Sequence, residues 1–482
     1  MSINVPIASP SAQLVPAFAL PLAAVLFLSF GLGPNYQLAL VGCLVLIVGF
    51  GALWRPGETP ILLFIFLHQW MQACLPPFYG NWKNLPVDQL TLNAGNQQLA
   101  SLLSMLGLAI MAGGMRMGAG SIDLWAAHVS KISFTRVPYA TLLRFFVGVW
   151  IAASACRFMA AVIPGLSQLF LALASLKWAA FTLLTYSTFA TANGKFGWWF
   201  AVFLAEFALS LGGYFSTFKE VFLYTLIALG ASQVRVTPKQ AFAVVIFLAT
   251  LVLFAVIWTA VKVDYRAFVR GDESAQVVTV SFGVAIAELF NLIFKVSAAD
   301  MYDAVDAMFN RIMYTEFFGV VLGHVPAVVP HEYGALWWDA ITRPVMPRLL
   351  FPDKAIIDES LLLNTYTGLG VAGMAEGTQI SLGYMTDAYI DFGEFGMMPV
   401  LFLVGLAIGR LYRWVLYGVR TYGLAGLAMA PVALMPAAAF EVSSAKLVGG
   451  LFAQILAVWL VARFIVPRFL PWALPDARWF QR

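Results

Sequence analysis

Residues 239–261 read KQAFAVVIFLATLVLFAVIWTAV, and after Lys239 this stretch contains no charged side chain. A helix that crosses a membrane needs about 20 mostly apolar residues, so this stretch is long enough for one crossing. Similar runs recur along the chain and predict twelve such helices. They lie near residues 15–32, 37–54, 60–77, 97–115, 140–163, 166–190, 197–215, 219–233, 239–261, 390–413, 423–440 and 447–469.

The composition agrees with this reading. Of the 482 residues, 61% are hydrophobic and 11% are charged, whereas a soluble protein carries about a quarter charged residues. This excludes a water-soluble enzyme, a disordered chain and a nucleic-acid binder. The apolar residues form continuous runs and do not alternate with polar ones, which also excludes an outer-membrane barrel. The predicted fold class is therefore all-α, a polytopic membrane protein with about twelve transmembrane helices.

The distribution of cations predicts the direction of the helices. If the N-terminus is cytoplasmic, 14 Lys and Arg residues fall in inner loops and the tail, against three in the short outer loops (Lys83, Lys219 and Lys446). Inner loops of membrane proteins carry such an excess. We therefore expect both termini in the cytoplasm.

The first apolar run has no basic residue before it and no cleavage site after it, so we expect a retained helix there.

This topology divides the chain into three parts. Residues 1–261 form a bundle of nine spans, residues 262–387 form a large outer loop, and residues 388–482 form the last three spans and a cytoplasmic tail. The outer loop contains 8 cations and 15 anions. So long a connection between spans is usually functional.

Part of the outer loop has a helical pattern. Residues 282–296 carry an apolar stripe, with Glu288 and Lys295 elsewhere on the helix. Asp300 is placed to cap a second helix that runs to about Phe318. Both helices are expected to lie along the membrane surface.

Charged residues inside the apolar runs leave three readings open. Lys177 and Glu206 lie near mid-membrane, and Arg157 lies closer to the outer end. Such residues are costly in hydrocarbon and face a partner or a cavity. They could form a structural pair, Glu206 with Lys177 or Arg157, or an outward pocket for an anionic ligand, or a proton relay.

In the tenth span, Gly405 and Gly409 predict a close helix–helix contact.

Metal and cofactor motifs were not found. The three cysteines lie in apolar runs without CxxC spacing, so neither a disulfide framework nor a zinc site is expected. His324 and His331 lack a third ligand at a suitable spacing. We therefore expect no metal and no cofactor.

The segment richest in chemical groups is 343–396. It reads RPVMPRLLFPDK at 343–354 and GTQISLGYMTDAYIDFGEFG at 377–396. Asp387, Asp391 and Glu394 are spaced four and three apart, so one face of a helix could carry all three. Carboxylates in a first helical turn also suit the helix dipole, which is the structural explanation for them.

This segment resembles the bacterial oligosaccharide repeat-unit polymerases, the O-antigen or Wzy-type polymerases. Phe351 stands where that family often has Trp, and Asp387 stands where it often has Glu. The residues that carry the resemblance are Pro347-Arg348, Phe351-Pro352-Asp353-Lys354, the turn from Thr378 to Gly383, Asp387, Tyr389, and Phe392-Gly393 with Gly396.

The resemblance implies a metal-independent glycosyltransferase in the bacterial inner membrane. Such an enzyme transfers a glycan from undecaprenyl diphosphate to the terminal sugar of a second lipid-linked unit at the outer face. Its partners would be the undecaprenyl-diphosphate-linked oligosaccharide and membrane lipids, with a flippase and a chain-length regulator acting beside it. No nucleic acid is involved.

This reaction requires a base for the acceptor hydroxyl and cations for the departing diphosphate. Asp387 is the first choice of base, followed by Glu394 and then Glu376. The candidate diphosphate ligands are Arg348, Arg311, Arg157, Arg343, Lys354 and Lys219. The candidate sugar contacts are Tyr384, Tyr389, Trp337 and Trp338.

Two other functions compete with the polymerase. A ligase of the O-antigen type, or another lipid-linked glycosyltransferase, would share the donor and the layout but use a different acceptor. A polysaccharide or lipid transporter, or flippase, would also have about twelve spans. It would be expected to show internal repeats with broken helices in matching halves, and the sequence has no such symmetry.

Overall fold

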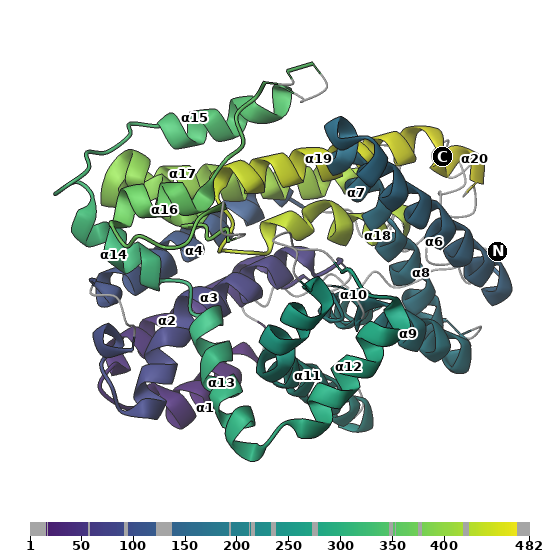
Figure 1. Ribbon diagram of the computed structural model, residues 1–482, viewed down its shortest axis with the longest axis horizontal. Coiled ribbons are helices and arrows are strands. Elements are labelled where there is room, and N and C mark those ends of the chain that lie inside the picture. The colour runs from purple at the N-terminus through teal and green to yellow at the C-terminus, as the bar shows by residue number, and fades with distance from the viewer. Residues whose placement is uncertain are drawn as a thin grey trace, which may run out of the picture.

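The computed structural model describes most of residues 16–469, and every regular element in that part is a helix (Figure 1). The residues inside this range that are not described are 17, 56–57, 91–94, 122–136, 192–193, 212, 214–216, 233–237, 272–277, 347–349, 352, 375–377 and 418–423. The helices that matter for the site are α1 (Ala19–Leu26), α2 (Tyr36–Leu53), α3 (Ile61–Lys83), α4 (Gln97–Ala119), α6 (Tyr139–Val162), α7 (Ser167–Ser175), α8 (Lys177–Ala190), α9 (Phe196–Leu211), α10 (Lys219–Ala231), α11 (Pro238–Arg270), α12 (Phe282–Lys295), α13 (Ala298–Ile312), α14 (Glu316–His324), α15 (Ala335–Thr342), α16 (Glu359–Thr367), α17 (Tyr384–Tyr417), α18 (Leu424–Leu434) and α19 (Ser444–Phe464).

The all-helical membrane fold is confirmed, but the described helices do not supply twelve complete spans. Eight of them are long and apolar enough to cross a membrane, or nine if α12 and α13, which meet at 108°, count as one. Three other apolar helices are shorter, at Ala19–Gly31, Phe196–Leu211 and Ala425–Ala437. The run predicted at 219–233 forms the 13-residue helix α10.

Helices α4 and α17 approach each other through glycines. A Cβ added to Gly405 would lie 2.1 Å from the carbonyl oxygen of Met111, and one added to Gly409 would lie 2.1 Å from that of Met115. No side chain fits at that distance, so only glycine lets the two backbones touch. The predicted close contact is confirmed, and it anchors α17 in the bundle.

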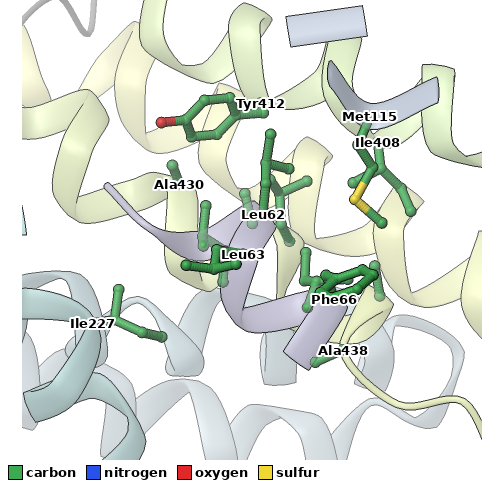
Figure 2. Close-up of a cluster of buried hydrophobic side chains, with 14 of the residues drawn as sticks. Leu62, Leu63, Phe66, Met115, Ile227, Ile408, Tyr412, Ala430 and Ala438 are labelled. Atoms are coloured by element: carbon green, nitrogen blue, oxygen red, sulfur yellow. The ribbon is translucent and has the colours of Figure 1, made fainter. Parts of the chain in front are cut away.

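The centre of the bundle is a core of aliphatic and aromatic side chains (Figure 2). Leu62, Leu63 and Phe66 of α3 lie in it between Ile408 of α17 and Ala430 of α18, and all five are buried. Burying one such side chain contributes about 1.5–3 kcal/mol. This core holds α3, α17 and α18 together.

Hydrogen bonds group the connections into two opposite ends of the bundle. At one end, the Thr59 hydroxyl donates to the carbonyl of Leu427 at 3.1 Å, and Tyr412 donates to the carbonyl of Thr59 at 3.1 Å. At the other end, the amide of Tyr384 donates to the carbonyl of Val442 at 2.7 Å. At each end, these bonds join segments that the cation pattern predicts to lie on the same side of the membrane.

The segment after α11 forms the two predicted helices, with two corrections to the second. Helix α12 matches the predicted 282–296 and packs on α11 through Ala285 and Leu289. Helix α13 is capped by Ser297 and not by Asp300, because Asp300 is the third residue of the helix and completes a capping box with Ser297. The helix ends at Ile312, before the expected Phe318.

Helix α17 corrects the expected start and face of the tenth span. It begins at Tyr384, so the predicted boundary at 387 falls inside its first turn. At Gly393 the backbone is not helical, with φ 70° and ψ −172°. This left-handed conformation favours glycine and turns the helix. As a result, Glu394 does not continue the face of Asp387 and Asp391, and its side chain is exposed.

Candidate functional site

Polar groups converge on the connection between α18 and α19, which contains the short 3-10 helix Met435–Ala437. Prolines end α18 early, so the carbonyls near Ala437 and Ala438 lack helical partners. Side chains of α3 replace those partners: Gln69 Nε2 donates to the Ala437 carbonyl at 2.6 Å, and His68 Nδ1 lies 2.9 Å from the Ala438 carbonyl. Irregular backbone within a membrane bundle is tolerated where protein groups or a cavity satisfy it.

Two carboxylates hold the first turn of α19. Glu359 accepts a hydrogen bond from the Ser443 hydroxyl at 2.5 Å and forms an ion pair with Lys446. Asp387 accepts from both the amide and the hydroxyl of Ser444, at 2.7 and 2.8 Å. A helix N-terminus has unpaired amides and a positive dipole, so it stabilises these charges.

A third carboxylate and a phenol complete the group. Glu441 is partly exposed and accepts a hydrogen bond from Gln72 of α3. Tyr314 donates to the carbonyl of Ser381. Burial raises the pKa of the Tyr314 hydroxyl, and the carboxylates of Glu441, Glu359 and Asp387 raise it further. We call Glu359, Asp387, Glu441, Tyr314 and Lys446 the α19 cluster.

Cations stand around the α19 cluster. Lys446 is half exposed, the charge of Lys219 acts on His68, and the charge of Arg311 acts on Tyr314. Both Lys219 and Arg311 are exposed. At such a place a carboxylate can accept a proton, and an exposed cation beside it can hold an anion.

The carboxylates predicted to act as base are placed differently by the structure. Asp387 is buried and bonded to Ser444, so its visible role is to join α17 to α19. Its neighbour Asp391, which was not a predicted base, accepts hydrogen bonds from the amides of Leu336 and Trp337, at 3.2 and 2.9 Å, and thereby caps α15. Glu376 and Arg348 lie outside the described residues.

Two of the predicted phosphate ligands are engaged within their own segment. Arg343 makes a two-pronged ion pair with Asp339, at 2.8 and 3.0 Å, and also donates to the carbonyl of Ala355. Lys354 donates to the carbonyls of Arg343 and Met346. These bonds tie Arg343 to Asp339 and Ala355, and Lys354 to Arg343 and Met346. Arg157, by contrast, is exposed, and its charge acts on Glu220.

Three of the four predicted sugar contacts are enclosed. Tyr384 donates to Gln69 Oε1 at 2.5 Å, and Tyr389 donates to the carbonyl of Val325 at 2.9 Å. Both rings and that of Trp337 are buried, so they pack the interior and do not offer a face for a sugar to stack on. Trp338 is exposed and keeps a free face.

The charges within the apolar runs form a pair. Lys177 Nζ lies 2.5 Å from Glu206 Oε2, and 4.5 Å from the ring centre of Trp178. This confirms the expected pairing of Glu206, with Lys177 and not Arg157 as the partner. The Trp178 ring in turn stacks on Tyr224 at 5.0 Å.

Sequence reasoning missed most of the α19 cluster. Glu359, Glu441 and Lys446 were not singled out, and neither was His68. One signal was available: His68, Gln69 and Gln72 place polar groups at i, i+1 and i+4 in an otherwise apolar span, which marks a face turned toward a polar partner.

Comparison with known proteins shows the family of the chain. No curated protein and no solved structure matches it. A family model does match, over residues 103–415, which is about two thirds of the chain. The matched part includes Glu359 and Asp387 but neither α3 nor α19. The chain therefore belongs to the family described as Domain of unknown function (DUF8712).

Proposed function

We propose that the protein is a glycosyltransferase that polymerises lipid-linked oligosaccharide repeat units at the outer face of the bacterial inner membrane. The observation that carries the proposal is the α19 cluster, in which three carboxylates meet exposed cations at one end of the bundle. The resemblance of 343–396 to repeat-unit polymerases supports it independently. The proposal includes twelve spans, cytoplasmic termini and an outer segment 262–387.

The chemistry assigned to the site is one transfer. The hydroxyl of the acceptor sugar attacks the anomeric carbon of the donor glycan, and the bond from that carbon to the diphosphate oxygen breaks. Undecaprenyl diphosphate leaves with the electron pair, and the hydroxyl proton passes to a carboxylate. Cations stabilise the negative charge that grows on the departing diphosphate.

We assign the base to Glu441 and the diphosphate contacts to Lys219, Lys446 and Arg311. Glu441 is more exposed than Glu359 or Asp387, so a substrate can reach it. Glu359 and Asp387 act as positioning residues because they hold the first turn of α19. The role of base thus passes from Asp387 to Glu441, another carboxylate of the α19 cluster.

The test is polymer formation by purified full-length protein in lipid nanodiscs, with lipid-linked repeat units as substrate and a gel ladder as readout. Glu441→Gln removes the proton acceptor while keeping the shape, and it should slow chain growth by about 10²–10⁴-fold. Glu394→Gln makes the same change at an exposed position beyond the Gly393 turn and should leave the ladder unchanged. A normal ladder from Glu441→Gln at equal protein level would refute the assignment.

A further inference from the structure

Helices α9, α10 and α11, with the end of α8, enclose a cavity of about 550 Å³. Nine of its seventeen lining residues are aromatic. They include Phe203, Phe222 and Phe247, whose rings pack against one another with centres 4.7–5.8 Å apart. This volume is in the range of sites that hold a small apolar ligand.

The polar atoms in the lining are already engaged. The hydroxyls of Thr225, Ser232 and Thr250 donate to carbonyls of their own helices, at 2.7, 2.6 and 2.9 Å. These donors therefore need no partner from a ligand. The cavity suits an apolar chain and disfavours a polar molecule or water.

The cavity is accessible from the side of the bundle. Phe196, Phe200, Leu204 and Ile246 line it, and their side chains are exposed on the outer surface of α9 and α11. In a membrane protein this surface faces lipid, so a hydrocarbon chain can enter from the bilayer without crossing water.

One face of α10 runs from the cavity to Lys219 at the start of the helix. Phe222, Thr225 and Leu229 line the cavity at spacings of three and four residues, and Lys219 lies three residues before Phe222. Residues at this spacing share a helix face, so a cation stands at the end of the apolar stripe. The charge of Lys219 acts on His68, which binds the connection before α19.

We propose that this cavity holds the part of the isoprenoid chain nearest the diphosphate of the lipid substrate, with the diphosphate at Lys219. The inference rests on the proposed function for the identity of the lipid. A carrier that presents its diphosphate to the α19 cluster must lay its chain along a face of the bundle near that cluster, and Lys219 of α10 and Glu441 of the cluster both interact electrostatically with His68.

The test is binding of radiolabelled geranylgeranyl diphosphate to full-length protein in nanodiscs. Ala243→Trp fills the cavity from its exposed side, whereas Ala249→Trp puts the same side chain on an exposed position of α11 outside the lining. The first variant should bind at least about tenfold more weakly, equivalent to 1.4 kcal/mol, and the second should bind as the unmodified protein does.

Inorganic diphosphate tests the other end of the ligand. Its binding should be unchanged in Ala243→Trp and weakened in Lys219→Gln, which should weaken geranylgeranyl diphosphate as well. Equal affinity of Ala243→Trp for geranylgeranyl diphosphate would overturn the assignment of the cavity. Lack of any effect of Lys219→Gln would overturn the position of the diphosphate.

Two further outcomes separate this inference from the proposed function. Competition by dioleoyl phosphatidic acid as strong as that by unlabelled geranylgeranyl diphosphate would overturn the inference and make the cavity a site for ordinary bilayer lipid. Polymer formation that Ala243→Trp does not slow would also overturn it, while the proposed polymerase stands. Binding that depends on the cavity, in a protein that forms no polymer, would support the inference and refute the polymerase.

Discussion

Lys177–Glu206 and Lys446–Glu359 are both ion pairs between helices, but water reaches only the second. The side chains of the first pair are 7% and 4% exposed. In the second pair Glu359 is 1% exposed, whereas Lys446 is 52% exposed. The first pair is closed on both sides, and the second presents its cation to the surface.

This difference separates a structural pair from one that can exchange partners. A closed pair loses hydration on both charges, so removal of either partner leaves a buried charge that water does not reach. In the open pair, water or an anionic ligand can take the place of the carboxylate at Lys446. For this reason the α19 cluster, and not the Lys177 pair, is the candidate site.

The largest effect is expected at the closed pair. Glu206→Gln leaves Lys177 buried without its counter-charge and should lower the free energy of unfolding by about 3–5 kcal/mol. The double variant Lys177→Met with Glu206→Leu should recover most of that loss. Denaturation in detergent micelles of the unmodified protein, Lys177→Met, Glu206→Leu and their double variant measures the cycle. Additive single effects would show that the two charges are not coupled.

A carboxylate at the opposite end of the bundle should make stability depend on pH. Burial raises the pKa of Glu58 to about 7, against the opposing charges of Arg116 and Arg55. Between pH 4.5, the ordinary value, and about 7, the folded state holds more protons, so the free energy of unfolding falls as pH rises through this window. The total change is about 3 kcal/mol.

Melting curves of the unmodified protein and Glu58→Gln at about pH 5 and pH 8 check this expectation. At the lower pH the unmodified protein should be more stable than Glu58→Gln. At the higher pH this advantage should be smaller or reversed. The same difference at both values would contradict a raised pKa.

The open pair should respond less than the closed one. Glu359→Gln keeps the shape of the side chain, and the Lys446 that it leaves behind is hydrated, so we expect a loss of about 1.5–3 kcal/mol. The denaturation assay used for Glu206→Gln allows direct comparison. A loss as large as that of Glu206→Gln would show that the exposure of Lys446 does not reduce the loss of unfolding free energy.

The smallest effect is expected where a carboxylate only caps a helix. Asp391→Ala removes the acceptor for the amides of Leu336 and Trp337 and should cost about 0.5–2 kcal/mol. Hydrogen exchange should accelerate in α15, while α19 keeps its protection. Faster exchange in α19 with no change in α15 would contradict the capping role. Asp391→Asn keeps one acceptor and serves as the mild control.

The predicted elements that agree with the structure depend on local pattern. The length and apolar character of the runs predict the membrane helices, and the stripe in 282–296 predicts α12. The glycines at 405 and 409 predict the contact with α4 because small side chains are required wherever helices touch. Each of these signals lies within one helix.

The α19 cluster could not be predicted in the same way. Glu359 and Lys446 are 87 residues apart, and Asp387 and Ser444 are 57 apart. Spacing within one helix says nothing of such partners. The break at Gly393 is a further example, because the pattern of carboxylates at 387, 391 and 394 is compatible with one helix face until the backbone turns.

By itself, then, the sequence determined an all-helical membrane chain and the need of each charge inside an apolar run for a partner or a cavity. These follow from the cost of placing polar groups in hydrocarbon, which acts on every residue wherever the chain goes. Only the tertiary structure decided which carboxylates remain near the surface and which become helix caps. That choice depends on which helix N-terminus arrives beside each carboxylate, and packing of distant segments decides it.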